Sequence, residues 1–212
     1  MTDALRFRPW KSPNFEKGID GVRLLIVGES HYSKIPVEND DPDFTIKIVE
    51  KVIEGKSKGK LKFFHNTQRL FEGIDASFGP PETKDSRAAF WSRVAFYNFI
   101  QEMMKGPGHA PDSDACDRGH TPFHNVMQEL QPRCVLFACK RLYMHTIKPH
   151  PHFKREADLE VNNTRRSTVT ISCRDTRALG SFIRHPSRLH HKELEEERLW
   201  IKALLQRSRC SS

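Results

Sequence analysis

The stretch RLLIVG, at residues 23–28, is a short apolar run suited to a strand that is buried on both faces. Three further runs have the same character: VAFYNF (94–99), RCVLFA (133–138) and STVTIS (167–172). Polar or Gly/Pro-containing sequence bounds each run, and the stretches between the runs are long enough for helices. We therefore expect an α/β fold: a single three-layer α/β/α domain, residues 1–212, with a central four-stranded parallel sheet.

Helix candidates lie between these strands and after the last one. They cover residues 44–55, 65–77, 84–92, 121–131 and 189–207. In the fourth candidate, Thr121 and Pro122 resemble a helix cap and a first helical residue. The segment 104–120 is rich in Gly, Pro and Asp and predicts a loop.

The composition limits the class of protein. The longest uninterrupted apolar run has six residues, 134–139, whereas a membrane-spanning helix needs roughly 18. The first residues, MTDALRFRPW, lack the apolar core of a secretion signal. Five cysteines without a CxxC pair indicate neither a disulfide framework nor a cysteine metal site. We expect a cytoplasmic, monomeric protein without a membrane span.

Positive charge is concentrated in one part of the chain. The formal net charge is +8, and residues 133–192 alone carry 13 Lys and Arg against 4 Asp and Glu, which leaves −1 for the rest. A basic balance confined to one third of the chain indicates a face for a polyanion, most commonly nucleic acid. A basic surface without a dedicated partner is the competing interpretation.

Polar residues follow three of the predicted strands. GESHY (28–32) follows the first strand, Asn98 ends the second, and HPS (185–187) follows the fourth. In a parallel sheet, ligands bind in the crevice beyond the carboxyl ends of the strands. We expect these groups, with Arg184 and Arg188 beside them, to form one cationic site for a ligand that carries negative charge.

These segments carry a resemblance to a known family. LLIVGESHY resembles the first motif of the uracil-DNA glycosylase superfamily, VAFYNF resembles its asparagine-bearing second strand, and HPS resembles the signature of its leaving-group loop. The stretch 122–138 is similar to the superfamily's helix and third strand, so the resemblance covers about residues 20–190. It implies a monofunctional DNA glycosylase that flips a modified pyrimidine out of DNA and hydrolyses its N-glycosidic bond, with no metal or other cofactor.

The resemblance also implies roles for individual residues. Asn98 matches the asparagine that hydrogen-bonds the edge of the flipped base, because an amide offers a donor and an acceptor side by side. His185 matches the histidine that stabilises negative charge on the departing base. The DNA-binding residues would be Arg184, Ser187, Arg188 and Leu189. Ser187 and Arg188 would contact phosphate, and Leu189 would lie near the wedge position.

The first motif departs from the family pattern at two positions. Ser30 stands where the superfamily has a water-activating aspartate, or asparagine or alanine, and a hydroxyl cannot serve as a general base near neutral pH. His31 replaces the motif's proline. Glu29 is therefore the candidate for orienting the water or contacting the base, with His31 as the weaker candidate and an ion pair with an arginine as the structural alternative. Tyr32 matches the tyrosine that packs against the pyrimidine C5 position and rejects thymine.

Several alternatives stay open at this level. The base is uracil or a phage-type modified cytosine such as glucosylated hydroxymethylcytosine, so the role is DNA repair or antiphage defence. A degenerate glycosylase fold that binds DNA without cleaving it is the main competing function. A hydrolase or transferase acting on a free nucleotide would need a Gly-rich phosphate loop, which the sequence lacks. The pairs His120/His124 and His150/His152 have metal-ligand spacing, but no carboxylate or cysteine set lies nearby in the sequence, so we predict no zinc site.

Overall fold

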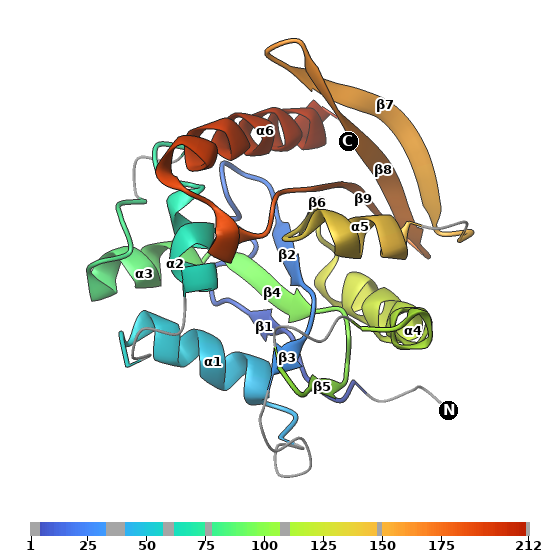
Figure 1. Cartoon of the computed structure of the whole chain (residues 1–212), viewed down its shortest axis with the longest axis horizontal. Coiled ribbons are helices and arrows are strands. Elements are labelled where there is room, and N and C mark those ends of the chain that lie inside the picture. Colours follow the sequence, from blue (N-terminus) through green and yellow to red (C-terminus); the bar gives the residue numbers. More distant parts are fainter. Residues whose placement is uncertain are drawn as a thin grey trace.

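A seven-stranded sheet forms the centre of the computed structural model, which describes residues 5–32, 41–56, 62–74, 78–106, 111–147 and 150–210. The strand order is β1-β4-β2-β6-β9-β8-β7 (Figure 1). The neighbours β4, β2, β6 and β9 run parallel, whereas β1, β8 and β7 pair antiparallel with their neighbours. The strands are β1 Trp10–Lys11, β2 Leu24–Gly28, β4 Val94–Asn98, β6 Cys134–Phe137, β7 Phe153–Val161, β8 Thr164–Cys173 and β9 Thr176–Phe182. A separate two-stranded parallel sheet joins β3 His31–Tyr32 to β5 Met103–Met104.

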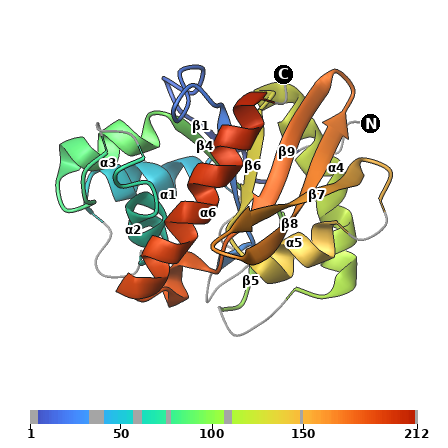
Figure 2. The ribbon, with the colours of Figure 1, turned by 90° about the horizontal axis from the view of Figure 1, so that it is seen from above.

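Helices cover both faces of the sheet (Figure 2). They are α1 Phe44–Ile53, α2 Lys62–Arg69, α3 Lys84–Trp91, α4 Ser113–Leu130, α5 Lys140–Thr146 and α6 His191–Cys210, with a 3-10 turn, η2, at Pro186–Arg188. Side chains of α1, α2, α3 and α6 pack with Leu24 and Ile26 of β2 in one core. Those of α4 and α5 pack with Leu25 and Val27 in the other. Because successive side chains of a strand point to opposite faces, β2 is apolar throughout and fully buried.

The predicted α/β class with a mostly parallel central sheet is confirmed, but the prediction of four parallel strands is wrong. The runs at 23–28, 94–99 and 133–138 contain β2, β4 and β6. The run at 167–172 is a strand, within β8, but it pairs antiparallel with both neighbours. The fourth parallel strand is β9, whose apolar residues Ala178, Leu179 and Phe182 are interrupted by Gly180 and Ser181. The mostly exposed, charged edge strand β7 carries no apolar pattern and was not predicted.

The helix predictions are confirmed in part. The expected helices at 44–55 and 84–92 correspond to α1 and α3, and the last helix is α6, shifted a few residues later. The expected helix at 65–77 is α2 at 62–69, and residues 75–77 lie outside the described residues. The predicted loop at 104–120 is wrong for 113–120, because α4 begins there with the Asp112 side chain accepting from the Ala115 N–H; residues 107–110 lie outside the described part. Pro122 therefore lies inside α4 rather than at its start.

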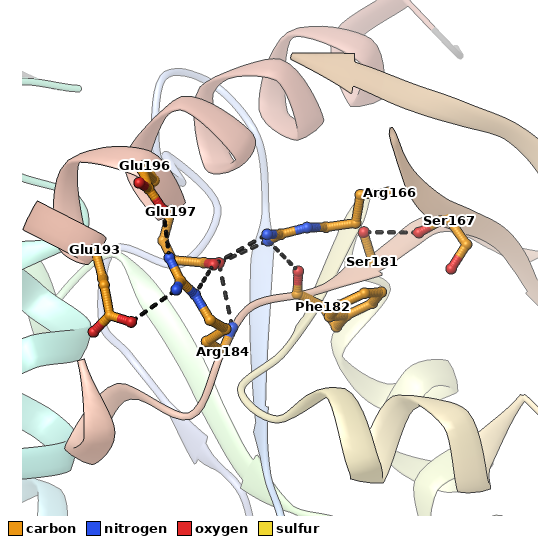
Figure 3. Close-up of polar contacts among 8 residues, drawn as sticks. All are labelled: Arg166, Ser167, Ser181, Phe182, Arg184, Glu193, Glu196 and Glu197. Atoms are coloured by element: carbon orange, nitrogen blue, oxygen red, sulfur yellow. Dashed lines mark hydrogen bonds and ion pairs between the residues drawn. The ribbon is translucent and has the colours of Figure 1, made fainter. Parts of the chain in front are cut away.

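The buried carboxylate of Glu197 connects α6 to the sheet through ion pairs (Figure 3). The side chain of Glu197 is completely buried and accepts hydrogen bonds from both terminal nitrogens of Arg166 on β8, at 2.6 and 3.0 Å. It also accepts from Arg184 Nε at 2.8 Å. The Arg166 guanidinium lies 4.4 Å from the Trp200 ring centre and donates to the Phe182 carbonyl oxygen. The same carboxylate thus joins α6, β8 and the segment that leads from β9 to residues 185–187.

We expect Glu197→Gln to lower the free energy of unfolding by about 3–5 kcal/mol, because the substitution leaves two arginines without their buried counter-charge. Chemical denaturation measures this loss. The matched control is Glu195→Gln on the same helix, whose more exposed carboxylate pairs with Arg198; it should cost less than about 1 kcal/mol. Equal losses in the two variants would contradict a special role for Glu197.

None of the described helices combines the length and the apolar composition that crossing a membrane requires.

Candidate functional site

The carboxyl end of β2 lies directly beside the carboxyl end of β4. The register pairs Gly28 with Asn98, so the first and second predicted site segments meet as expected. The Asn98 side chain is buried over Gly28: a Cβ added at Gly28 would lie 2.2 Å from Asn98 Oδ1. Only glycine leaves room for this amide. The glycine of GESHY therefore determines where Asn98 is held.

The Asn98 amide is positioned by a buried histidine. Its Nδ2 lies 3.1 Å from Nδ1 and 3.2 Å from Nε2 of His31, and the same Nε2 lies 2.8 Å from Thr45 Oγ1 on α1. The rings of Phe7 and Phe44 pack edge-on against the imidazole. Burial lowers the pKa of His31 to about 4, so the ring is neutral near pH 7. A neutral ring satisfies both contacts, with Nδ1 accepting from the amide and Nε2–H donating to the hydroxyl.

Glu29 forms a two-point ion pair. Arg141 Nε and Nη2 donate to the two carboxylate oxygens at 2.9 and 2.6 Å. The Glu29 side chain is buried, whereas the Arg141 side chain is half exposed. Glu29 was expected either to orient water or the base or to pair with an arginine, and this geometry shows the ion pair. Arg141 lies on α5, just after the carboxyl end of β6. Its place therefore follows the same rule as that of Glu29 and Asn98, since polar residues after parallel strands meet at one edge of the sheet.

Ser30 directly precedes β3 and Tyr32 ends it, so the two residues stand before and after His31 in the chain. The Ser30 hydroxyl is buried and makes no hydrogen bond of ordinary geometry within the described ranges, although it lies near Tyr32. Tyr32 is partly exposed, and burial of its remaining surface raises the pKa of the phenol. The pairing of β3 with β5 places His31 opposite Met103 and Tyr32 opposite Met104. Ser30 therefore places a buried hydroxyl near the Tyr32 phenol, at the position that directly follows Glu29 in the chain.

His185 opens the η2 turn after β9. Its Nδ1 lies 2.8 Å from Ser187 Oγ, and its ring centre lies 5.4 Å from that of Phe63 on α2. Burial lowers the pKa of His185, the positive charges of Arg188 and Arg141 lower it further, and Glu29 opposes them. The imidazole is therefore neutral near pH 7 and lies within electrostatic reach of the Glu29–Arg141 pair. The third predicted segment thus joins the first two.

Two residues of α2 that the sequence did not single out support this turn. Asn66 is buried, and its Nδ2 donates to the carbonyl oxygens of Pro186 at 2.8 Å and Leu189 at 3.4 Å. Phe63 is half-buried, between His185 and Phe96 of β4. The predicted helix began at residue 65, so it left Phe63 out. Neither residue carries a local signal for its contact, because its partners lie more than thirty residues away.

The expected DNA-binding residues have different surroundings. Arg184 forms ion pairs with Glu193, Glu196 and Glu197 (Figure 3). Leu189 is buried in the core that α2 and α6 share with the sheet. Ser187 is half-buried and bonded to His185, whereas Arg188 is exposed. In this arrangement Arg188 is the cation of the turn that faces solvent.

No protein-family model matches the chain, and no curated protein matches it. The fold and the site define a mixed α/β protein in which an amide, an ion-paired carboxylate and a neutral imidazole meet at the carboxyl edge of a parallel sheet.

The pH dependence of stability tests the burial of His31. Between pH 6.5 and about 4, the unfolded chain binds a proton at this histidine that the folded chain does not. The free energy of unfolding therefore falls as the pH falls through this window, by up to about 1.4 kcal/mol per pH unit for one such group. We expect His31→Gln to reduce this slope in denaturation curves recorded from pH 7 to 4, while His120 and His124, whose pKa burial also lowers to about 4, keep their own contribution. His191→Gln, at an exposed position of α6, is the control and should keep the parent slope. Parallel slopes for parent and His31→Gln would contradict a buried neutral ring.

Proposed function

We propose that this protein is a monofunctional DNA glycosylase that flips a modified pyrimidine from DNA and hydrolyses its N-glycosidic bond. The observation that supports this proposal is the convergence of Asn98, Glu29 and His185 at one edge of the parallel sheet. Three different segments of the chain supply them, in the order that the superfamily resemblance implies. The base that fits the proposal is uracil or a phage-type modified cytosine.

Asn98 would recognise the base. Its amide oxygen occupies the space that the missing Cβ of Gly28 leaves, and its nitrogen contacts His31. The direction of the amide is therefore set before a ligand arrives. A preorganised amide loses little freedom on binding and distinguishes donors from acceptors on the base edge. The half-buried ring of Phe63, next to His185, offers a face on which an extruded base can stack.

His185 would stabilise the departing base. If the Ser187 hydroxyl donates to Nδ1, the neutral imidazole carries its proton on Nε2 and can donate it to a base oxygen as negative charge develops there. A donor that is already in place when charge appears lowers the barrier without costly reorganisation. The lowered pKa of His185 supports this role, because a neutral ring donates a hydrogen bond without adding a full charge to the site.

Glu29 would act through its charge and not as a strong base. Both of its oxygens are bonded to Arg141, which holds the carboxylate in position. A fixed negative charge favours the cationic sugar that forms as the base leaves, and the carboxylate together with the Ser30 hydroxyl can orient the attacking water. Bond cleavage then depends mainly on stabilising the two charged fragments.

We expect His185→Ala to lower base release at least about tenfold and to change DNA affinity little, because the imidazole acts on charge that exists only in the transition state. Gel detection of abasic sites measures release on duplexes that carry uracil, mismatched thymine, deaminated purines or phage-modified cytosines. His191→Ala on α6 is the control and should retain the parent rate. Full activity in His185→Ala would remove this histidine from the mechanism.

A second candidate function is DNA binding without cleavage. It is favoured by the pairing of Glu29 with Arg141 and by the hydroxyl of Ser30 at the position of a catalytic acid. Salt-dependent binding to DNA with no abasic product on any of these substrates would support it.

Glu29→Gln distinguishes the two functions. For a glycosylase, loss of the charge should reduce base release by about 10²–10³-fold, the range typical of one lost electrostatic contact, whereas Ser30→Ala should cost much less. Binding to DNA, measured by fluorescence anisotropy, should stay close to the parent value in both variants. Equal release by Glu29→Gln and the parent would contradict a catalytic role for the carboxylate.

A further inference from the structure

The fold brings together four imidazoles and a thiol that are distant in the sequence. This histidine cluster consists of His120, His124, His150, His152 and Cys173. The first two lie one turn apart on α4, the next two precede β7, and the cysteine ends β8. The ring centres of His120 and His150 are 4.3 Å apart, and those of His124 and His152 are 4.1 Å apart. Two pairs with metal-ligand spacing thus become one cluster.

Three of these imidazoles have unsatisfied nitrogens. Nδ1 of His120, Nε2 of His124 and Nδ1 of His150 are buried and have no hydrogen-bond partner among the residues described. Buried polar atoms are normally paired, so three unpaired nitrogens at one place indicate a missing ligand. Neutral imidazole is the form that binds metal ions.

We propose that His120, His124 and His150 bind one divalent transition-metal ion of the zinc class. One ligand nitrogen from each residue lies within 4.8 Å of the other two. Two histidines four residues apart on a helix present their rings on the same face, a common arrangement for zinc. Zinc–nitrogen bonds of about 2.0–2.1 Å require the three nitrogens to approach one another slightly. The stacked His150 ring must turn to aim its nitrogen at the ion.

A second ligand set shares one member with the first. His124, His152 and Cys173 also offer ligand atoms within 4.8 Å of one another. In that set only His124 contributes a buried nitrogen without a partner in the described structure, and His152 donates its Nδ1–H to the Ser172 carbonyl oxygen, which leaves Nε2 as its ligand atom. The unsatisfied nitrogens favour the set of three imidazoles.

A metal ion here would join parts of the fold that meet through ring contacts of these histidines. It would link α4 to the segment before β7. His120 packs edge-on against Phe99, with ring centres 5.4 Å apart, and Phe99 directly follows Asn98. The ion would therefore stabilise the end of β4, and its effect would be visible in protein stability whether or not the protein cleaves DNA.

Zinc titration of the full-length protein tests the proposal. After removal of metal with a chelator, calorimetric titration with zinc chloride should give one ion per chain, and zinc should raise the melting temperature. His120→Ala, His124→Ala and His150→Ala should each weaken binding at least tenfold. His145→Ala on α5 is the matched control, because its Nδ1 is also buried without a partner in the described structure but belongs to neither ligand set. It should bind zinc like the parent.

Each contrary outcome overturns the assignment. No stoichiometric zinc binding, or unchanged affinity in His120→Ala and His150→Ala, would remove the site. Cobalt in place of zinc tests the ligand type, because a thiolate ligand adds an intense near-ultraviolet charge-transfer band. Such a band in the parent, lost in Cys173→Ser, would overturn the set of three imidazoles. His150 lies outside the helices, so its variant keeps the test valid if either α4 variant fails to fold.

Discussion

The geometry of the candidate site depends on the ion pairs that the buried carboxylate of Glu197 forms with two arginines. This carboxylate lies between Arg166 of β8 and Arg184, one residue before His185. A charge removed from water in this way is tolerated only when its partners are in place, so α6, β8 and the η2 turn must come together as a unit. Asn66 holds the other side of the turn through two backbone carbonyls. The imidazole of His185 is thus positioned from both sides.

The polar groups at the sheet edge are held by different means. Asn98 depends on a space that only Gly28 leaves and on a histidine kept neutral by burial. Glu29 depends on a guanidinium contributed by α5. Each group is oriented by the protein before any ligand binds, which is the condition under which electrostatic stabilisation is most effective. The Ser30 hydroxyl, with no partner of ordinary geometry in the described structure, is the group left for a water or a ligand.

The distribution of charge along the sequence differs from its distribution in space. Residues 133–192 carry a formal balance of +9, but that window ends just before the glutamates of α6. In the folded chain Glu193, Glu196 and Glu197 neutralise Arg184, and Glu197 also neutralises Arg166. The basic face is therefore smaller than the count suggests, and Arg188 is its exposed cation beside the site.

The sequence by itself determined the features that depend on local pattern. Apolar runs long enough for buried strands predicted β2, β4 and β6, and the strand-end rule correctly predicted that Gly28 and Asn98 would meet. It could not show that β9 and not β8 is the fourth parallel strand, because both carry apolar residues and the direction of each strand depends on the neighbour with which it pairs. The pairing of Glu29 with Arg141, the place of Phe63 and the union of the two histidine pairs were decided only by the tertiary structure. These contacts join residues far apart in the chain, and their energy depends on burial and distance, which no local pattern encodes.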